Sequence, residues 1–181
     1  MRGKRMVLMG IAVVLVLAAG VAAFLWHLPS APMEAVERDC AGTEFAVSSP
    51  LGEIDMGEGR TLCLYWNQDG AMDGAVTHET LGSHRVVSTH GHLFPRDDVR
   101  VLMQMGAVEQ GDHYILFGWI QDEAVDRVVY GGRTLPQFEA AGTRCFYEFG
   151  PGEIPETDYT LYDAQGNELP HQYPEEEQSA S

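Results

Sequence analysis

The sequence predicts an all-β protein, an antiparallel β-sandwich carried behind a single N-terminal transmembrane helix. Residues 6–26, MVLMGIAVVLVLAAGVAAFLW, form an unbroken apolar run. From Glu44 onward, short runs rich in Val, Ile, Tyr, Phe and Trp are separated by Gly, Pro and Asp clusters about every 8 to 12 residues, which is typical of an all-β domain. After residue 26 the sequence lacks a long apolar stripe of helical period, so we expect strands rather than helices.

The apolar run is long enough to cross a bilayer, because 21 helical residues reach roughly 31 Å. Arg2, Lys4 and Arg5 precede it, and only acidic charges follow at first. The positive-inside rule then places residues 1–5 in the cytoplasm and everything from His27 onward outside the cell membrane. A cleaved signal peptide is the alternative, but the run continues through Trp26, past the small residues at 21–23, which favours an uncleaved anchor.

The remaining chain divides into three parts. Residues 27–42 begin with two prolines and are expected to form a tether. Residues 43–170 are long enough for one domain with its own core. The acidic tail at 171–181 has nothing to bury and is predicted to be disordered.

Each strand is predicted from a short apolar or alternating run, and each connection from turn-forming residues. Asn67–Gly70 is a strong turn sequence, residues 121–123 require a tight connection, and residues 163–167 indicate a hairpin with Gly166 at positive φ. The predicted strands span 44–48, 60–66, 74–80, 84–90, 99–105, 113–120, 124–130, 134–139, 143–149 and 158–163, with a short closing strand at 167–169.

Three cysteines lie in a part of the chain that is predicted to face an oxidising compartment. Cys63 and Cys145 fall in strand-like runs, so a bridge between them across a sheet is our first hypothesis. The absence of any bridge and a pairing of Cys40 remain open alternatives.

The charge excludes several classes of partner. The chain has a formal net charge of −16, and all 27 acidic residues follow the apolar run, against eight arginines there. Such a field repels nucleic acid and anionic lipid headgroups. A phosphate-binding Gly loop is also missing from the sequence, so we expect no nucleotide and no cofactor.

The order of the elements carries a resemblance. The segments concerned are LCLYW at 62–66, GAVTHET at 74–80, YILFGWI at 114–120, CFY at 145–147 and LYDAQGNEL at 161–169. Over residues 60–169 the chain resembles a loose group of uncharacterised, membrane-anchored extracytoplasmic β proteins of Gram-positive bacteria. Its C-terminal half is similar in pattern to immunoglobulin-like sandwich modules. The resemblance implies a fold and a location but no activity or catalytic residue.

His78, His84, His90 and His92 are the best candidates for metal ligands. Residues two apart in a strand share a face, so His90 and His92 could bind one zinc ion, with His78 or His84 on a neighbouring strand. The Asp-His that follows the His-x-His of β-lactamase-like hydrolases is missing, because Leu93 follows His92. Surface histidines in a Gly-containing loop remain the better explanation of the group.

Two other patterns favour structural explanations. The acidic loop at 69–74 fails the test for an EF-hand, because Ala71 and Thr80 stand where oxygen ligands are required. The strand aromatics are expected to pack in the core, and an exposed row that recognises glycan is the alternative. These aromatics are Tyr114, Phe117, Trp119, Tyr130, Phe146, Tyr147 and Phe149.

The sequence therefore predicts a non-enzymatic binding or structural module of the cell envelope. Its partners would be the bilayer, through residues 6–26, and an envelope protein or cell-wall component. A small zinc-dependent envelope hydrolase that uses the histidines at 78–92 is the competing hypothesis. A third is an adaptor whose apolar edge strand is completed by a partner protein.

Overall fold

The computed structural model describes residues 14–18, 20, 28–94, 102–110 and 113–171. Most of the predicted anchor at 6–26 and nearly all of the predicted tail lie outside these residues. Within the described part of the chain, no helix is long and apolar enough to cross a membrane.

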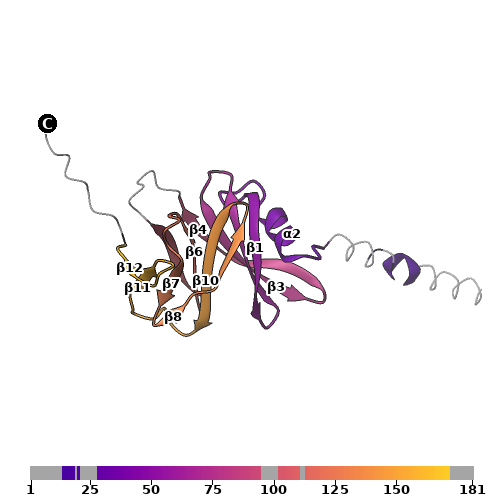
Figure 1. Cartoon of the computed structure of the whole chain (residues 1–181). Coiled ribbons are helices and arrows are strands. Elements are labelled where there is room, and N and C mark those ends of the chain that lie inside the picture. Colours follow the sequence, from indigo (N-terminus) through magenta and orange to yellow (C-terminus); the bar gives the residue numbers. More distant parts are fainter. Residues whose placement is uncertain (1–13, 19, 21–27, 95–101, 111–112, 172–181) are drawn as a thin grey trace, which may run out of the picture.

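The all-β prediction is confirmed, because the described residues of the domain form three antiparallel four-stranded sheets, accompanied by helix α2 (Pro32–Asp39) (Figure 1). The first sheet is a meander of β1 (Val47–Gly57), β2 (Arg60–Asn67), β3 (Met72–Thr80) and β4 (Ser83–Leu93). The central sheet has the order β5 (Met103–Gln110), β6 (His113–Ile120), β10 (Thr143–Pro151) and β9 (Gln137–Ala140). The third has the order β12 (Glu168–Leu169), β11 (Tyr159–Tyr162), β7 (Arg127–Tyr130) and β8 (Arg133–Thr134). A sandwich has two packed sheets, whereas the described residues form three.

The layers follow from alternation along the strands, which sends successive side chains to opposite faces. In β6, Ile115 and Phe117 pack against Leu62 of the first sheet, while Leu116 packs against Leu161 of the third. The central sheet is therefore buried on both faces. This explains why β6 is apolar along most of its length rather than alternating.

The predicted tether at 27–42 contains a helix that belongs to the domain. Helix α2 (Pro32–Asp39) packs Met33 and Val36, with its C-cap Cys40, against Cys63 and Tyr65 on the outer face of the first sheet. Proline at the first helical position is favourable because its missing N–H has no partner there anyway. The apolar side chains are three and four residues apart, so they share one face.

Several strand boundaries differ from those predicted. The first strand runs over 47–57 rather than 44–48, with irregular register around Pro50 and Gly52 that hides the alternation. The expected strand at 134–139 divides at Leu135 and Pro136 into β8 and β9, which lie in different sheets. The start of the strand predicted at 99–105 lies outside the described residues.

Two of the three predicted connections form as expected. Gly166 has φ +85°, and Asp163 Oδ1 accepts hydrogen bonds from the N–H groups of Gln165 and Asn167. The hairpin between β11 and β12 is thereby confirmed. The Asn67–Gly70 turn is also present, with Gly70 at φ +80°. Residues 121–126, in contrast, carry the chain from the central to the third sheet and do not form a tight hairpin.

Candidate functional site

The four histidines of the predicted metal site are spread along β3 and β4. His78 lies opposite Arg85 and His84 opposite Glu79, close to the turn between the two strands. His90 contacts Ser88 Oγ through Nε2 at 2.9 Å. Among the described residues, no group of three or more His, Cys, Asp or Glu side chains could hold a metal ion. The structure therefore does not bring the predicted ligands together.

His92 instead belongs to a buried polar network at the end of β4. Asp73 is fully buried and accepts a hydrogen bond from the His92 N–H at 2.7 Å, and its Oδ1 lies 3.2 Å from His92 Nδ1. Asn67 donates to Asp73 Oδ2 at 2.9 Å. Gly91 makes room for this carboxylate, because a Cβ there would lie 1.8 Å from Asp73 Oδ1. The network satisfies the buried carboxylate and links β2, β3 and β4 at one end of the first sheet.

The acidic segment at 69–74 contains the end of the turn between β2 and β3 and the start of β3. Asn67 Oδ1 accepts hydrogen bonds from the N–H groups of Asp69 and Ala71, and so holds the turn closed. Asp73 points inward to His92 rather than into the loop. The turn explanation chosen from the sequence agrees with this geometry.

The expected Cys63–Cys145 bridge is not present, and all three cysteines are buried free thiols. Alternation along β2 directs Cys63 toward α2, whereas Cys145 lies between the first and central sheets. Burial raises the pKa of both thiols to about 12. A thiol that stays protonated is a poor nucleophile, so neither residue is a candidate for catalysis.

The aromatic strand residues divide between core and surface. Tyr114, Phe117, Tyr130 and Phe146 are buried, as expected for core packing. Tyr147 and Phe149 are only partly buried, and their rings stack with centroids 6.4 Å apart and an interplanar angle of 11°. The Phe138 ring lies 6.2 Å from that of Tyr147. These three residues, Phe138, Tyr147 and Phe149, form an aromatic row at one edge of the central sheet.

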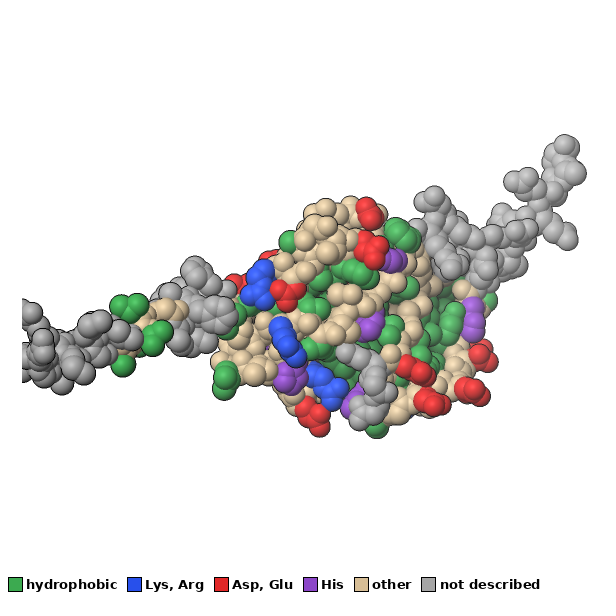
Figure 2. All heavy atoms as spheres, turned by 180° about the vertical axis from the view of Figure 1, so that it is seen from behind, with side chains coloured by type: hydrophobic (Ala, Val, Ile, Leu, Met, Phe, Trp, Pro, Cys, Tyr) green, Lys and Arg blue, Asp and Glu red, His purple; other side chains and the backbone are tan. Residues whose placement is uncertain are grey.

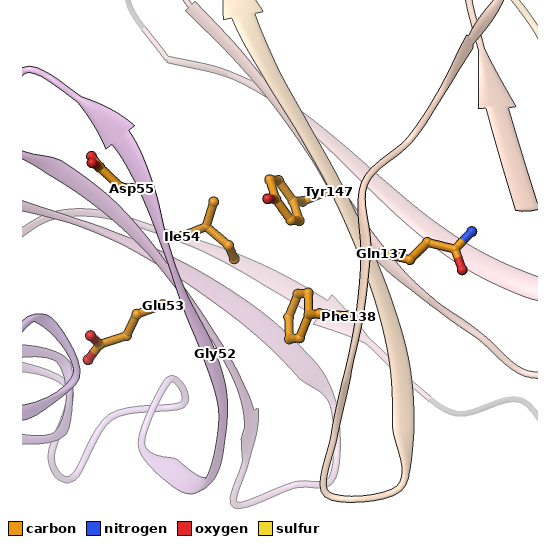
Figure 3. A pocket seen from close by; sticks show the side chains of 7 residues that line it. All are labelled: Gly52, Glu53, Ile54, Asp55, Gln137, Phe138 and Tyr147. Carbon is orange, nitrogen blue, oxygen red and sulfur yellow. The ribbon is translucent and has the colours of Figure 1, made fainter.

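A groove of about 500 Å³ lies between the edge strand of the first sheet and this aromatic row. Figure 3 shows Ile54, Phe138 and Tyr147 pointing toward one another across it, while Glu53 and Asp55 point away on the other side of β1. Gly52 is essential to the shape, because a Cβ there would lie 2.8 Å from the Phe138 ring. The groove thus has an apolar, aromatic lining and is open to solvent.

A second groove of about 390 Å³ adjoins the first, because Tyr147 lines both. Here β9 no longer pairs with β10 beyond Phe146, and the side chains of Arg133, Glu148 and Phe149 reach the surface of the groove. We call the two grooves together the aromatic groove. Their remaining lining residues are Glu53, Ile54, Asp55, Gln137, Thr134 and Pro136, with Gly52 and Phe138 as above.

The second groove also contains a cluster of charged and polar groups. Glu148 is almost fully buried, and its Oε1 accepts hydrogen bonds from the Tyr114 hydroxyl, at 3.0 Å, and from Arg133. Its Oε2 is buried without a hydrogen-bond partner. The Arg133 side chain is 65% exposed, so donors of its guanidinium remain available to a ligand. Its interactions with Tyr114 and Glu148 raise the pKa of Arg133, which keeps the group charged.

Comparisons of the chain with protein-family models, with curated proteins and with solved structures gave no match.

This site is only partly predictable from the sequence. Core packing is the first prediction for Tyr147 and Phe149, with an exposed row that recognises glycan as the alternative, and both residues pack against the core while staying partly exposed. Nothing in the local sequence points to Phe138. The available signal was the spacing of Tyr147 and Phe149, two residues apart and hence on one face of a strand. That face is uncovered because β9 pairs with only part of β10. Local sequence does not specify this pairing.

Proposed function

We propose that the protein is a membrane-anchored, extracytoplasmic binding module of the cell envelope that holds a glycan of the cell wall in the aromatic groove. Residues 6–26 would span the membrane with the N-terminus in the cytoplasm, and the β domain would lie outside. Stacked antiparallel sheets are the architecture of many cell-surface binding modules, including immunoglobulin-like ones, and the third sheet would be an addition to that plan.

The observation that carries the proposal is the partly exposed aromatic row Phe138, Tyr147 and Phe149, which lines two adjoining grooves. Binding sites combine a mostly apolar, aromatic lining with a few polar groups that fix orientation. Sugar rings present flat C–H faces that pack on aromatic rings, and their hydroxyl and carboxylate groups need donors and acceptors at the rim. Arg133 and Tyr147 line the second groove and would supply such groups.

The proposal includes no catalysis. A zinc-dependent hydrolase would need its ligands within bonding distance of one ion, and the histidines at 78–92 diverge along two strands. Glu148 is held by Tyr114 and Arg133, which suits the positioning of an arginine for binding.

Thermal unfolding of the full chain in detergent, with and without soluble peptidoglycan fragments, tests the proposal. A ligand at 100 times its dissociation constant stabilises by about 2.7 kcal/mol. We expect stabilisation by the fragments and at least a tenfold loss of affinity, about 1.4 kcal/mol, in a Tyr147→Ala variant. Phe94→Ala is the matched control, because Phe94 is 52% exposed and lies outside the groove. Equal affinity in the two variants, or no stabilisation by any fragment, would refute the proposal.

A further inference from the structure

Leu81, at the tip of the β3–β4 hairpin, serves neither the core nor the turn. Its side chain is 98% exposed, the largest exposure among the large hydrophobic residues that the structure describes. It also has φ +54°, and Gly82 follows with φ +76°. Two positive φ values in a two-residue loop define a type I′ turn, for which Asn-Gly is preferred. A leucine in this conformation costs about 1 to 2 kcal/mol, so the fold alone does not account for it.

The hairpin is tied to the point where the chain emerges from the predicted membrane segment. The His84 N–H donates a hydrogen bond to the carbonyl of Pro29 at 3.0 Å. Pro29 is three residues beyond Trp26, the last residue of the predicted span, and three residues reach at most about 11 Å. Figure 1 shows the hairpin extending on the side of the domain where α2 lies, away from the third sheet. Its tip is therefore held close to the membrane surface if residues 6–26 are the anchor.

The charge near the tip would permit contact with a membrane surface, although the domain as a whole is acidic. Residues 78–85 contain one acid, Glu79, and one arginine, Arg85, together with His78 and His84. The one acid and the one arginine cancel, so the tip carries no net formal charge. Figure 2 shows basic side chains in the half of the domain nearer the N-terminal segment, with acidic side chains among them. The repulsion between the acidic chain and anionic lipid headgroups is therefore weaker at this hairpin than elsewhere on the domain.

We propose that the β3–β4 hairpin inserts Leu81 into the headgroup layer of the membrane, as a second contact that fixes the orientation of the anchored domain. The inference rests on the membrane anchor of the proposed function, but not on the aromatic groove. Because the anchor already holds the tip near the bilayer, the contact gains from a high effective concentration and needs little affinity of its own. A fixed orientation would keep the aromatic groove, one layer further from α2, facing the cell wall.

Site-directed spin labelling of the full chain in phosphatidylcholine vesicles tests the inference. A nitroxide is attached to Leu81→Cys and, as the matched control, to Ala141→Cys, which occupies the same kind of turn in the β9–β10 hairpin with φ +50°. The unsubstituted chain is the blank, because its three cysteines are buried. We expect the label at 81 to become accessible to oxygen and shielded from a water-soluble nickel complex, while the label at 141 stays exposed to nickel.

Flotation of the same vesicles separates the possible failures. If the chain floats with the vesicles and the two labels behave alike, the hairpin contact is refuted and the anchor stands. If the chain does not float, the anchor fails and the inference falls with it. A Leu81→Asn variant that unfolds at the same or a higher denaturant concentration than the parent shows that Leu81 is not required for folding. A marked loss of stability in that variant would contradict the premise.

Discussion

At the scale of single residues, His90 is expected to make the stability of the protein depend on pH. Burial lowers the pKa of His90 below its ordinary value of 6.5. A group whose folded pKa is depressed contributes stability that is present above the unfolded pKa and is lost as pH falls through the folded pKa. We therefore expect the free energy of unfolding to fall as the pH drops below about 6.5, and to fall less steeply in a His90→Gln variant. Denaturant unfolding at several pH values measures this free energy for both proteins. The same pH dependence in the parent and the variant would contradict the prediction.

The cysteines give a second prediction at this scale. Because all three are buried free thiols, the native chain should resist alkylation, and the unfolded chain should take up the reagent at Cys40, Cys63 and Cys145 without any reductant. Mass mapping of the exported protein reads out each site. A Cys63–Cys145 peptide pair that appears only under non-reducing conditions would show that the bridge forms after all.

The cysteines also show what local sequence could not specify. Cys63 and Cys145 were correctly placed in strands, but a bridge between them depends on which face of its strand each side chain occupies. Cys63 faces α2, whereas its neighbours Leu62 and Leu64 face the central sheet. A shift of one residue would have brought Cys63 to the same side as Cys145. Gly166, in contrast, was predictable because its positive φ is dictated by the turn itself.

At the scale of elements, α2 is one whose removal should destabilise the domain. It buries Met33 and Val36 against the first sheet, and full burial of such a side chain contributes about 1.5 to 3 kcal/mol. A domain that begins at residue 42 should therefore be less stable than one that begins at residue 28 by about 3 to 6 kcal/mol, taken as an upper bound. Chemical denaturation of both measures the difference. Equal stability would mean that the helix is a tether, as the sequence suggested.

Most strands could be read from the sequence because their apolar runs are long and are separated by turn residues, as in β6 and β10. The first strand was misplaced because Pro50 and the register shifts interrupt its alternation. The packing of α2 against the first sheet was not predicted, because eight residues give only two turns of pattern. The candidate site was missed for a different reason. It exists only where the edge of β1 meets Phe138 and the open edge of β10, and that meeting is a property of how sheets stack.

At the scale of the whole molecule, the charge distribution and the predicted anchor give an expectation about topology. All acidic residues follow the apolar run, and positive charges precede it. An epitope appended after Ser181 should be reached by antibody on intact cells, and one placed before Met1 only after the membrane is opened. Labelling of the C-terminal epitope only in opened cells would contradict the proposed orientation.

The binding groove is the central claim, and mapping by nuclear magnetic resonance tests it most directly. An isotopically labelled protein beginning at residue 28 would be titrated with soluble peptidoglycan fragments while the amide resonances are followed. The account predicts shifts centred on Phe138, Tyr147 and Phe149 and on Arg133, with the β3–β4 hairpin unchanged. Shifts centred on the histidines of β3 and β4, or no shifts at ligand concentrations that stabilise the full chain, would contradict it.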